Sequence, residues 1–490
     1  MWYTKPMQPH PTNRSPTTQP SVERVPIWDN LRFILMGLVV FGHSLELAKG
    51  VVPLAQYVYT YLYAFHIPLF VFLSGHLSKP ELSHGDYFKI LSKIILPYAV
   101  AQLLYLVMGH FLWGTFSVSP SFLLPYRHLW FFVSLVLWRL LLPLFLQVRG
   151  AFVISVVIAI LVGYSDAVGG FLSLSRTFVF FPFFILGHLT RQHHIERWRS
   201  RPGRAVALLV LLIAAVVIAH YRDDIPYGLF FGKYSYAGMG WQEMSAGLYR
   251  LAFIAVACLM GAAVIILTPT RRLAITGLGT RTAYSYILHM IPMVLAAKFN
   301  FFGVLQRLSH APFLLVAELA VFTIVVHVFL SSKPVAVAFR VIAEPPRRFV
   351  GPMLAAVFVI VAVLVYSPTL LYFGVPQIPA TDIAALPPTT VVSQCGSCRP
   401  IPPRGLVVRF APKQYSDRLE MSLNGGCVYQ LRYFQNNMDV GTATLDLRKS
   451  AASALATRTV ALPQWVRSGG LDELLIVPSD NRNQVIGHLQ

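Results

Sequence analysis

The chain has 490 residues, of which 56% are hydrophobic and 12% are charged. Soluble globular proteins average about half apolar and a quarter charged residues, so this composition excludes an ordinary soluble domain and places most of the chain in lipid. The formal net charge is +20. The basic residues nevertheless lie in short loops between apolar runs and form no patch or helix stripe, which excludes nucleic-acid binding. Residues 1–27 are expected to form a disordered cytoplasmic tail, because no signal-peptide cleavage site follows them.

Apolar runs recur through the first three quarters of the chain. A membrane-spanning helix needs roughly 20 mostly apolar residues. On this measure residues 28–374 are predicted to form an all-α, polytopic membrane domain of about ten or eleven transmembrane helices. The predicted spans are Trp28–Leu47, Tyr57–Leu77, Ile90–Leu112, Leu129–Val148, Ala151–Tyr164, Thr177–Leu189, Ala205–His220, Gly247–Leu267, Thr282–Phe301, Phe313–Ser331 and Phe349–Phe373.

Lysines and arginines gather in alternate loops, and this sets the predicted orientation. Short positively charged loops are retained in the cytoplasm, so the N-terminus is placed inside. The basic residues on the cytoplasmic side are Lys79, Lys89, Lys93, Arg149, Arg191, Arg197, Arg199, Arg201, Arg204, Arg271, Arg272, Arg281, Lys333, Arg340, Arg347 and Arg348. We expect a multi-pass protein of the bacterial plasma (inner) membrane.

The region after the last span changes from apolar to polar, and an odd number of spans places it outside the cytoplasm. Residues 375–400 are a Pro-rich linker. Residues 401–490 show short alternating stretches with Asn-Gly and Gly-Gly turns, which predict a small extracytoplasmic β-sandwich. In an oxidising compartment Cys427 is expected to pair with either Cys395 or Cys398. No metal site is expected, because these cysteines lack a good fourth ligand.

The first span carries ionisable side chains, which inside a membrane are candidates for function by default. Arg32 lies near the cytoplasmic face, and His43 follows about 16 Å further along the helix axis. The two residues cannot touch, but they are placed to engage opposite ends of one long ligand. Glu46 follows on the same face, where a carboxylate orients an imidazole that acts as a base. The alternative is that Arg32 snorkels to lipid phosphates and His43 is an ordinary hydrogen-bonded histidine.

The second span places His66 close to mid-membrane, at a depth comparable with that of His43. These two side chains are therefore expected to line one cavity. Near the inner end of the span, Ser74 and Gly75 allow either close helix packing or the passage of an acyl-pantetheine arm.

Other polar and aromatic residues mark the ends of later spans. Lys89 and Lys93 share one face at the cytoplasmic start of the third span, where they suit the phosphates of coenzyme A or serve only as positive-inside anchors. His289 lies a turn or two inside the cytoplasmic boundary, where it contacts a donor or is structural. On the outer side Trp130 is placed to stack on a sugar ring, although aromatic belts are common there. Arg176 is the stronger candidate for a functional role, because the orientation rule disfavours arginine at the outer face.

Taken in order, these segments resemble acyltransferase family 3, especially its fucose 4-O-acetylase-like branch, over about Trp28–Ser331. The motifs are Arg32 and His43 with ten residues between them, FHIPLFVFLSG, the lysines before ILPY, HLWFF, RTFVFFPFFILGH and YSYILH. The resemblance implies an acyl-CoA-dependent O-acyltransferase of ten helices in which Arg32 and His43 are essential. His43 then activates the acceptor hydroxyl or carries the acyl group transiently. Where the wider family often has arginine-x-x-arginine, this chain has Lys89 and Lys93.

The sequence therefore predicts an enzyme that moves an acyl group, acetyl in the first instance, from cytoplasmic acyl-CoA to a hydroxyl of an extracytoplasmic envelope glycan or glycolipid. Acyl-CoA is a co-substrate, and no resident cofactor is expected. The alternative is a transporter or flippase for a lipid-linked saccharide with the histidines as a proton relay, but the inverted repeats typical of such proteins are not seen. A third hypothesis makes the β tail the only active part, carried on a membrane anchor.

Overall fold

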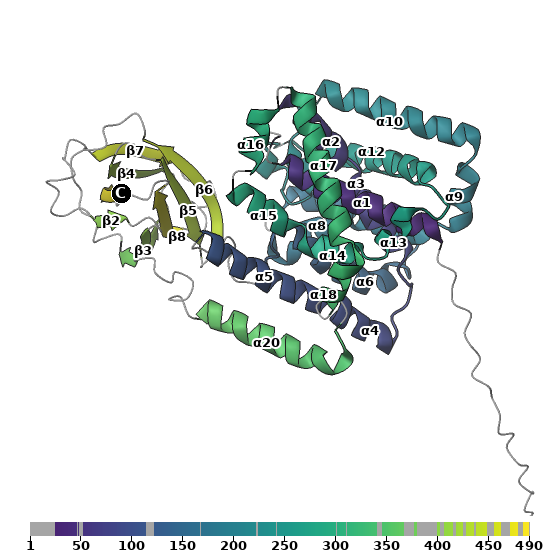
Figure 1. The fold of residues 1–490 in the computed structure, drawn as a ribbon, viewed down its shortest axis with the longest axis horizontal. Coiled ribbons are helices and arrows are strands. Elements are labelled where there is room, and N and C mark those ends of the chain that lie inside the picture. Colours follow the sequence, from purple (N-terminus) through teal and green to yellow (C-terminus); the bar gives the residue numbers. More distant parts are fainter. Residues whose placement is uncertain are drawn as a thin grey trace, which may run out of the picture.

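The computed structural model describes most of the helical part of the chain and the strands that follow it (Figure 1). The described residues are 25–46, 48, 52–113, 122–166, 168–221, 224–241, 243–299, 301–309, 311–340, 345–366, 377–379, 399–401, 406–414, 418–424, 428–435, 438–447, 455–461, 471–478 and 484–489. The predicted N-terminal tail before residue 25 lies outside them.

The first part of the chain is helical throughout its described elements. The α-helices are α1 (Pro26–Leu45), α2 (Pro53–Tyr63), α3 (His66–His76), α4 (His84–Ile90), α5 (Leu96–Trp113), α6 (Trp130–Phe145), α7 (Ala151–Leu161), α8 (Leu174–Leu189), α9 (Gln192–Trp198), α10 (Arg201–Tyr221), α11 (Tyr227–Phe231), α12 (Ala246–Leu267), α13 (Ala274–Gly279), α14 (Thr282–Leu288), α15 (Met290–Lys298), α16 (Phe301–Leu308), α17 (Pro312–Leu330), α18 (Lys333–Ala338) and α20 (Arg347–Tyr366). Short helical turns are η1 (Leu91–Ile95), η2 (Arg127–Leu129), η3 (Val162–Tyr164), η4 (Phe171–Ser173) and η5 (Ala237–Met239).

Seven helical segments within the described residues are long and apolar enough to cross a membrane. They are Pro53–His76, His84–Met108, Arg127–Phe145, Phe171–Leu189, Arg201–Tyr221, Ala246–Leu267 and Pro312–Leu330. Each overlaps one of the predicted spans. A mostly helical, multi-pass membrane protein is therefore confirmed in this coarser form.

The other four predicted spans contain no helix in the described residues that is both long and apolar enough to cross a membrane. α1 covers the first of them, but Asp29, Asn30 and Arg32 in its opening turns lower its hydropathy. The fifth, Ala151–Tyr164, is apolar but shorter. The ninth is divided at His289 into α14 and α15. The last, Phe349–Phe373, contains most of α20, and its residues after Tyr366 lie outside the described ones. A total of ten or eleven spans stays a prediction.

Polar side chains anchor α1, the helix that carries the predicted pair, to its neighbours. The side-chain amide of Asn30 donates to two backbone carbonyl oxygens in the segment before α13. The Nε2–H of His327, on α17, donates to the carbonyl oxygen of Phe33 at 3.0 Å. Ser44 and Thr323, also on α17, share a hydrogen bond of 3.0 Å between their hydroxyls. In an apolar medium such bonds have no competing water, so they fix the rotation and depth of α1.

Two glycines allow α3 and α8 to pack backbone against backbone. A Cβ added at Gly75 would lie 2.0 Å from the carbonyl oxygen of Phe184. A Cβ added at Gly187 would lie 2.0 Å from the carbonyl oxygen of Phe72. Small residues permit such close crossings inside membranes. Of the two roles that the Ser-Gly pair suggested, the structure shows close helix packing.

Replacing Gly75 by alanine is expected to lower the unfolding temperature of the detergent-solubilised protein by several degrees. The added Cβ would meet backbone, which has no freedom to move aside, and overpacking of this kind costs about 1–3 kcal/mol. Gly277→Ala, at an exposed position of α13, is the matched control because nothing lies within 4 Å of its added Cβ. Equal unfolding temperatures for the two variants would contradict the close α3–α8 packing.

The strands that follow α20 pair into two sheets. They are β1 (Gln377–Pro379), β2 (Arg399–Ile401), β3 (Leu406–Gln414), β4 (Arg418–Asn424), β5 (Val428–Gln435), β6 (Met438–Asp446), β7 (Leu455–Ala461), β8 (Leu471–Pro478) and β9 (Gln484–Leu489). The orders are β1-β3-β8-β5-β6 and β2-β9-β4-β7. Apolar residues of both sheets, such as Leu431 and Met421, share one buried cluster. β1 lies in the stretch predicted as a linker. A β-sandwich domain outside the cytoplasm stays a prediction.

Candidate active site

A cavity of about 430 Å³ lies beyond the C-terminal end of α1. Its walls come from α1, α2, α3, α6, α8, α11 and α14 and from the segments that precede α6 and follow α11. The predicted site residues that line it are His43, Glu46, Trp130 and Arg176. The cavity thus gathers side chains that lie far apart in the sequence.

His43 and Glu46 form a pair at the C-terminal end of α1. The helix begins at Pro26, a residue suited to a first helical turn because its ring fixes φ and its missing N–H is not needed there. It ends at Leu45, so His43 lies in the last turn and Glu46 caps the helix. Nδ1 of His43 lies 3.4 Å from Oε2 of Glu46. This spacing of three residues brings the two side chains to one face, as the sequence suggested.

Two further residues hold the Glu46 carboxylate. The hydroxyl of Tyr59, on α2, donates to Oε1 of Glu46 at 3.3 Å. Nη1 of Arg127, which precedes α6, lies 3.9 Å from Oε2 of Glu46. The carboxylate is three-quarters buried, and these contacts stabilise its charged form. It can therefore offer a negative charge to the imidazole of His43.

Two more histidines lie against His43. The ring centroids are 5.2 Å apart for His43 and His289, 4.5 Å for His128 and His289, and 6.4 Å for His43 and His128. Nδ1 of His289 faces the carbonyl oxygens of Ser285 and Tyr286 at 3.1 and 2.9 Å. Because carbonyl oxygens only accept, Nδ1 carries the proton and Nε2 is left as an acceptor. His128 was not predicted as a site residue, although it begins the HLWFF motif.

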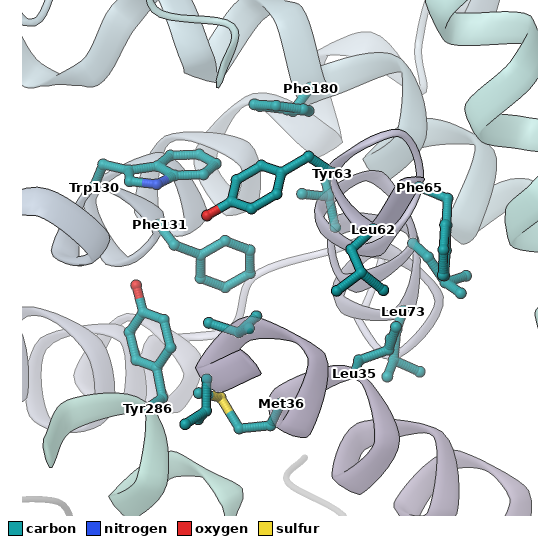
Figure 2. Close-up of a cluster of buried hydrophobic side chains, with 14 of the residues drawn as sticks. Leu35, Met36, Leu62, Tyr63, Phe65, Leu73, Trp130, Phe131, Phe180 and Tyr286 are labelled. Atoms are coloured by element: carbon teal, nitrogen blue, oxygen red, sulfur yellow. The ribbon is translucent and has the colours of Figure 1, made fainter. Parts of the chain in front are cut away.

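Aromatic side chains form the apolar walls of the cavity (Figure 2). The indole of Trp130 stacks on Phe180, with centroids 5.4 Å apart. Tyr63 and Tyr286 lie on either side of Phe131 in the same close-up. The Tyr286 hydroxyl donates to the carbonyl oxygen of His128, which fixes the segment that carries that histidine. Flat aromatic faces of this kind suit the apolar face of a sugar ring or an acyl chain.

Arg176 and Lys233 add positive charge to the cavity wall. The guanidinium of Arg176 lies over Trp130, 5.0 Å from the ring centroid, and its Nε–H donates to the carbonyl oxygen of Phe231 at 3.1 Å. Lys233 follows α11 and also lines the cavity. Desolvation by the surrounding protein, together with the charge of Arg176, lowers the pKa of the Lys233 ammonium below its usual value. Sequence analysis did not single out Lys233, because it lies in a loop without a motif.

Comparison with known protein families identifies the chain. A family model described as an acyltransferase domain matches residues 25–365, which include every helix named above except the end of α20. The chain belongs to acyltransferase family 3. No curated protein and no solved structure matches the chain. The match covers all the helical walls of the cavity, so the helical part of this membrane acyltransferase is its enzymatic part and not a mere anchor for the β tail.

Three further predicted residues of the acyltransferase, His66, Arg32 and the fully buried His289, do not line the cavity. His66 is almost fully buried, and its Nδ1 lies 2.7 Å from the carbonyl oxygen of Leu62. Its ring meets Tyr63 edge to face, with centroids 4.7 Å apart, so His66 supports a wall residue but does not line the cavity. Arg32 is one-third exposed and forms an ion pair of 2.9 Å with Asp29. It lies more than half of the length of α1 away from His43, as the sequence predicted.

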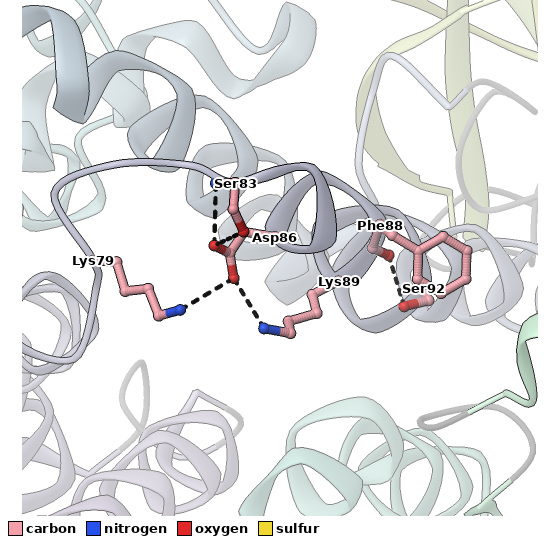
Figure 3. A network of polar contacts seen from close by, with 6 residues as sticks. All are labelled: Lys79, Ser83, Asp86, Phe88, Lys89 and Ser92. Carbon is pink, nitrogen blue, oxygen red and sulfur yellow. Dashed lines mark hydrogen bonds and ion pairs between the residues drawn. The ribbon is translucent and has the colours of Figure 1, made fainter. Parts of the chain in front are cut away.

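Of the two lysines predicted for the donor, Lys89 lies in the last turn of α4 (Figure 3) and Lys93 lies in η1. Neither lines the cavity. Nζ of Lys89 lies 3.0 Å from Oδ1 of Asp86, and Nζ of Lys79 lies 3.5 Å from the same atom. Asp86 also accepts hydrogen bonds from the backbone and side chain of Ser83, which caps α4. Lys93 is exposed, and the ion pairs of Asp86 in the described part of the chain are those with Lys79 and Lys89. Lys79 and Lys89 thus share one carboxylate.

The remaining predictions concern cysteines and metals. Cys395, Cys398 and Cys427, the candidates for a disulfide, lie outside the described residues. Cys258 is the free thiol of the described part of the acyltransferase and is half-buried in α12. Within the described ranges no group of three His, Cys, Asp or Glu side chains is arranged to hold a metal ion.

Proposed function

We propose that this acyltransferase moves an acyl group, acetyl in the first instance, from cytoplasmic acyl-CoA to a hydroxyl of an envelope glycan or glycolipid outside the bacterial plasma membrane. The fucose 4-O-acetylase-like branch of the family is the proposed relationship. The observation that carries the proposal is the His43–Glu46 pair, 3.4 Å apart, at the edge of an aromatic cavity. A positioned base can activate a sugar hydroxyl, and flat aromatic walls suit the apolar face of the sugar ring.

The pair supports a chemical sequence in which His43 is the general base. With Nδ1–H directed to Glu46, Nε2 of His43 accepts the proton of the acceptor hydroxyl. The hydroxyl oxygen then attacks the thioester carbonyl, a C–O bond forms, the C–S bond breaks and the thiolate of coenzyme A leaves. The imidazolium returns its proton to that thiolate. Glu46 stabilises the positive imidazolium in between, and a transient acyl-His43 is the alternative route to the same products.

The donor is proposed to reach this centre from the end of α1 that carries Arg32. An unbroken helix from Pro26 to Leu45 keeps Arg32 about 16 Å from His43, a distance that an extended pantetheine arm is needed to bridge. Arg32, Lys89 and Lys93 are the proposed contacts of the coenzyme A phosphates. His289 lies beside His43 and is the proposed contact of the thioester end. The β domain is proposed to bind or position the glycan.

Label transfer tests the proposed function. Membranes that contain the protein are expected to move label from acetyl-CoA to envelope glycan, and the label should be released by mild alkali because the product is an ester. Membranes from a deletion strain are the control. If the protein instead accumulates a lipid-linked saccharide in sealed vesicles without any acyl donor, and transfers no label, it is a flippase and the proposal is wrong.

A further inference from the structure

The cavity carries more positive than negative charge. Among its described lining residues, Arg127, Arg176 and Lys233 are cationic and Glu46 is the one carboxylate. Arg127 lies 3.9 Å from Glu46 and compensates it. Within the described part of the chain, neither Arg176 nor Lys233 is within ion-pair distance of a carboxylate. The cavity that His43 lines therefore also presents two charges that no carboxylate of the described residues neutralises.

Arg176 is held in a fixed position with its charge toward the cavity. Its Nε–H donates to the carbonyl oxygen of Phe231, and its plane lies over Trp130. The hydrogen bond uses one of the five N–H groups of the guanidinium. The remaining N–H groups form the fork that binds carboxylate or phosphate with two parallel hydrogen bonds. An arginine on a membrane-spanning segment costs at least a few kcal/mol, which favours a functional role.

A tight turn brings Lys233 next to Arg176. Gly232 adopts a left-handed conformation, with φ of +60°, and a Cβ there would approach Val179 and Phe180 of α8 at 3.0 Å. Its carbonyl oxygen accepts a hydrogen bond of 2.8 Å from Ser175, so the turn is tied to the start of α8 beside Arg176. Two like charges held this close repel each other. An anion bound between them removes that repulsion.

We propose that the acyl acceptor carries an anionic group, a carboxylate or a phosphate, that binds between Arg176 and Lys233 while a nearby hydroxyl reaches His43. This proposal rests on the proposed function and names its acceptor as an acidic saccharide. The anion of the acceptor, and not a phosphate of coenzyme A, fits this position. The segments that hold Arg176 and Lys233 lie by the His43 end of α1, whereas the donor enters from the Arg32 end.

Thermal unfolding tests the anion site without requiring transfer. Full-length protein in detergent is titrated at constant ionic strength with glucuronate, glucose 6-phosphate or glucose. At least one acid is expected to raise the unfolding temperature while glucose does not, because a ligand stabilises the state that binds it. The acid with the larger effect identifies carboxylate or phosphate as the recognised group. An equal effect of glucose, or no effect of any of the three sugars, would overturn the proposal.

Variants assign the effect to the two cations. Arg176→Gln and Lys233→Gln are each expected to weaken the apparent affinity for the acid about tenfold or more, the size of a lost charged hydrogen bond. Lys233→Arg should keep most of the affinity, because it keeps the charge. Lys298→Gln, an exposed lysine of α15 outside the cavity, is the matched control. Unchanged affinity in both glutamine variants would overturn the site.

Transfer kinetics separate this proposal from the proposed function. With an acidic acceptor, Arg176→Gln should raise the KM for the acceptor and leave the KM for acyl-CoA unchanged. A raised KM for acyl-CoA alone would assign the cations to the donor and overturn the inference, while acyl transfer itself would stand. If no acceptor is acylated by the wild-type protein, the proposed function fails, and the unfolding titration still decides whether the anion site exists.

Discussion

His43→Gln is expected to lower kcat/KM for acyl transfer by about two to four orders of magnitude, the usual contribution of a general base. Glutamine keeps the approximate length of the side chain and its capacity for hydrogen bonds, but it cannot accept the proton of a hydroxyl at neutral pH. Nδ1 of His43 lies 3.4 Å from the Glu46 carboxylate, so in the proposed mechanism Nε2 is the atom that takes that proton. Label transfer from acetyl-CoA, measured at several acceptor concentrations, gives the change.

The control for this substitution is His220→Gln, which changes an exposed histidine near the end of α10. It should transfer at the wild-type rate. Both variants should unfold at the wild-type temperature, since neither side chain fills the apolar core. If His43→Gln transfers as fast as the wild-type protein, His43 is neither base nor acyl carrier and the mechanism is wrong.

The arrangement of residues within a single helix could be predicted from the sequence. The separation of Arg32 and His43 and the shared face of His43 and Glu46 follow from the rise and period of an α-helix. They hold in the structure because α1 runs without a break from its first turn to its last. Apolar length and composition predicted the seven segments that can cross a membrane in the same way.

Arrangements that depend on how helices cross could not be predicted. His43, His128 and His289 come from three distant segments, and their rings meet only because α1, η2 and the junction of α14 with α15 converge. A hydropathy pattern gives the depth of each residue but not the direction in which its helix faces. The same limit explains His66. It belongs to a predicted span, but its ring packs against Tyr63, which lines the cavity, and does not itself reach the cavity surface.

Residues in loops were the hardest to assign. Arg127 precedes α6 and Lys233 follows α11, and neither belongs to a recognisable sequence motif. The turn at Gly232 that positions Lys233 depends on contacts with α8. In one case a usable signal was present. Asp86 lies three residues before Lys89, a spacing typical of an ion pair on one helix face, and the structure shows this pair at 3.0 Å. The charge of Lys89 is therefore shared with a carboxylate.

Glu46→Gln is expected to lower kcat about 10- to 100-fold. Glutamine has the same shape and can still accept the hydrogen bond from Tyr59. It lacks the charge that stabilises the imidazolium of His43, and a charged hydrogen bond contributes about 1.5–3 kcal/mol. Because this stabilisation develops only as the proton is transferred, kcat should fall while the KM for acyl-CoA stays constant.

Glu243→Gln, an exposed carboxylate in the segment before α12, is the control for the loss of one negative charge. It should leave both kcat and KM unchanged. Removing His43 as well distinguishes two roles for Glu46. If Glu46 acts through the imidazole, the double variant with His43→Gln should be no slower than His43→Gln alone. If the two losses instead multiply, Glu46 acts on the substrate directly, and the assignment of Glu46 as the residue that orients His43 is wrong.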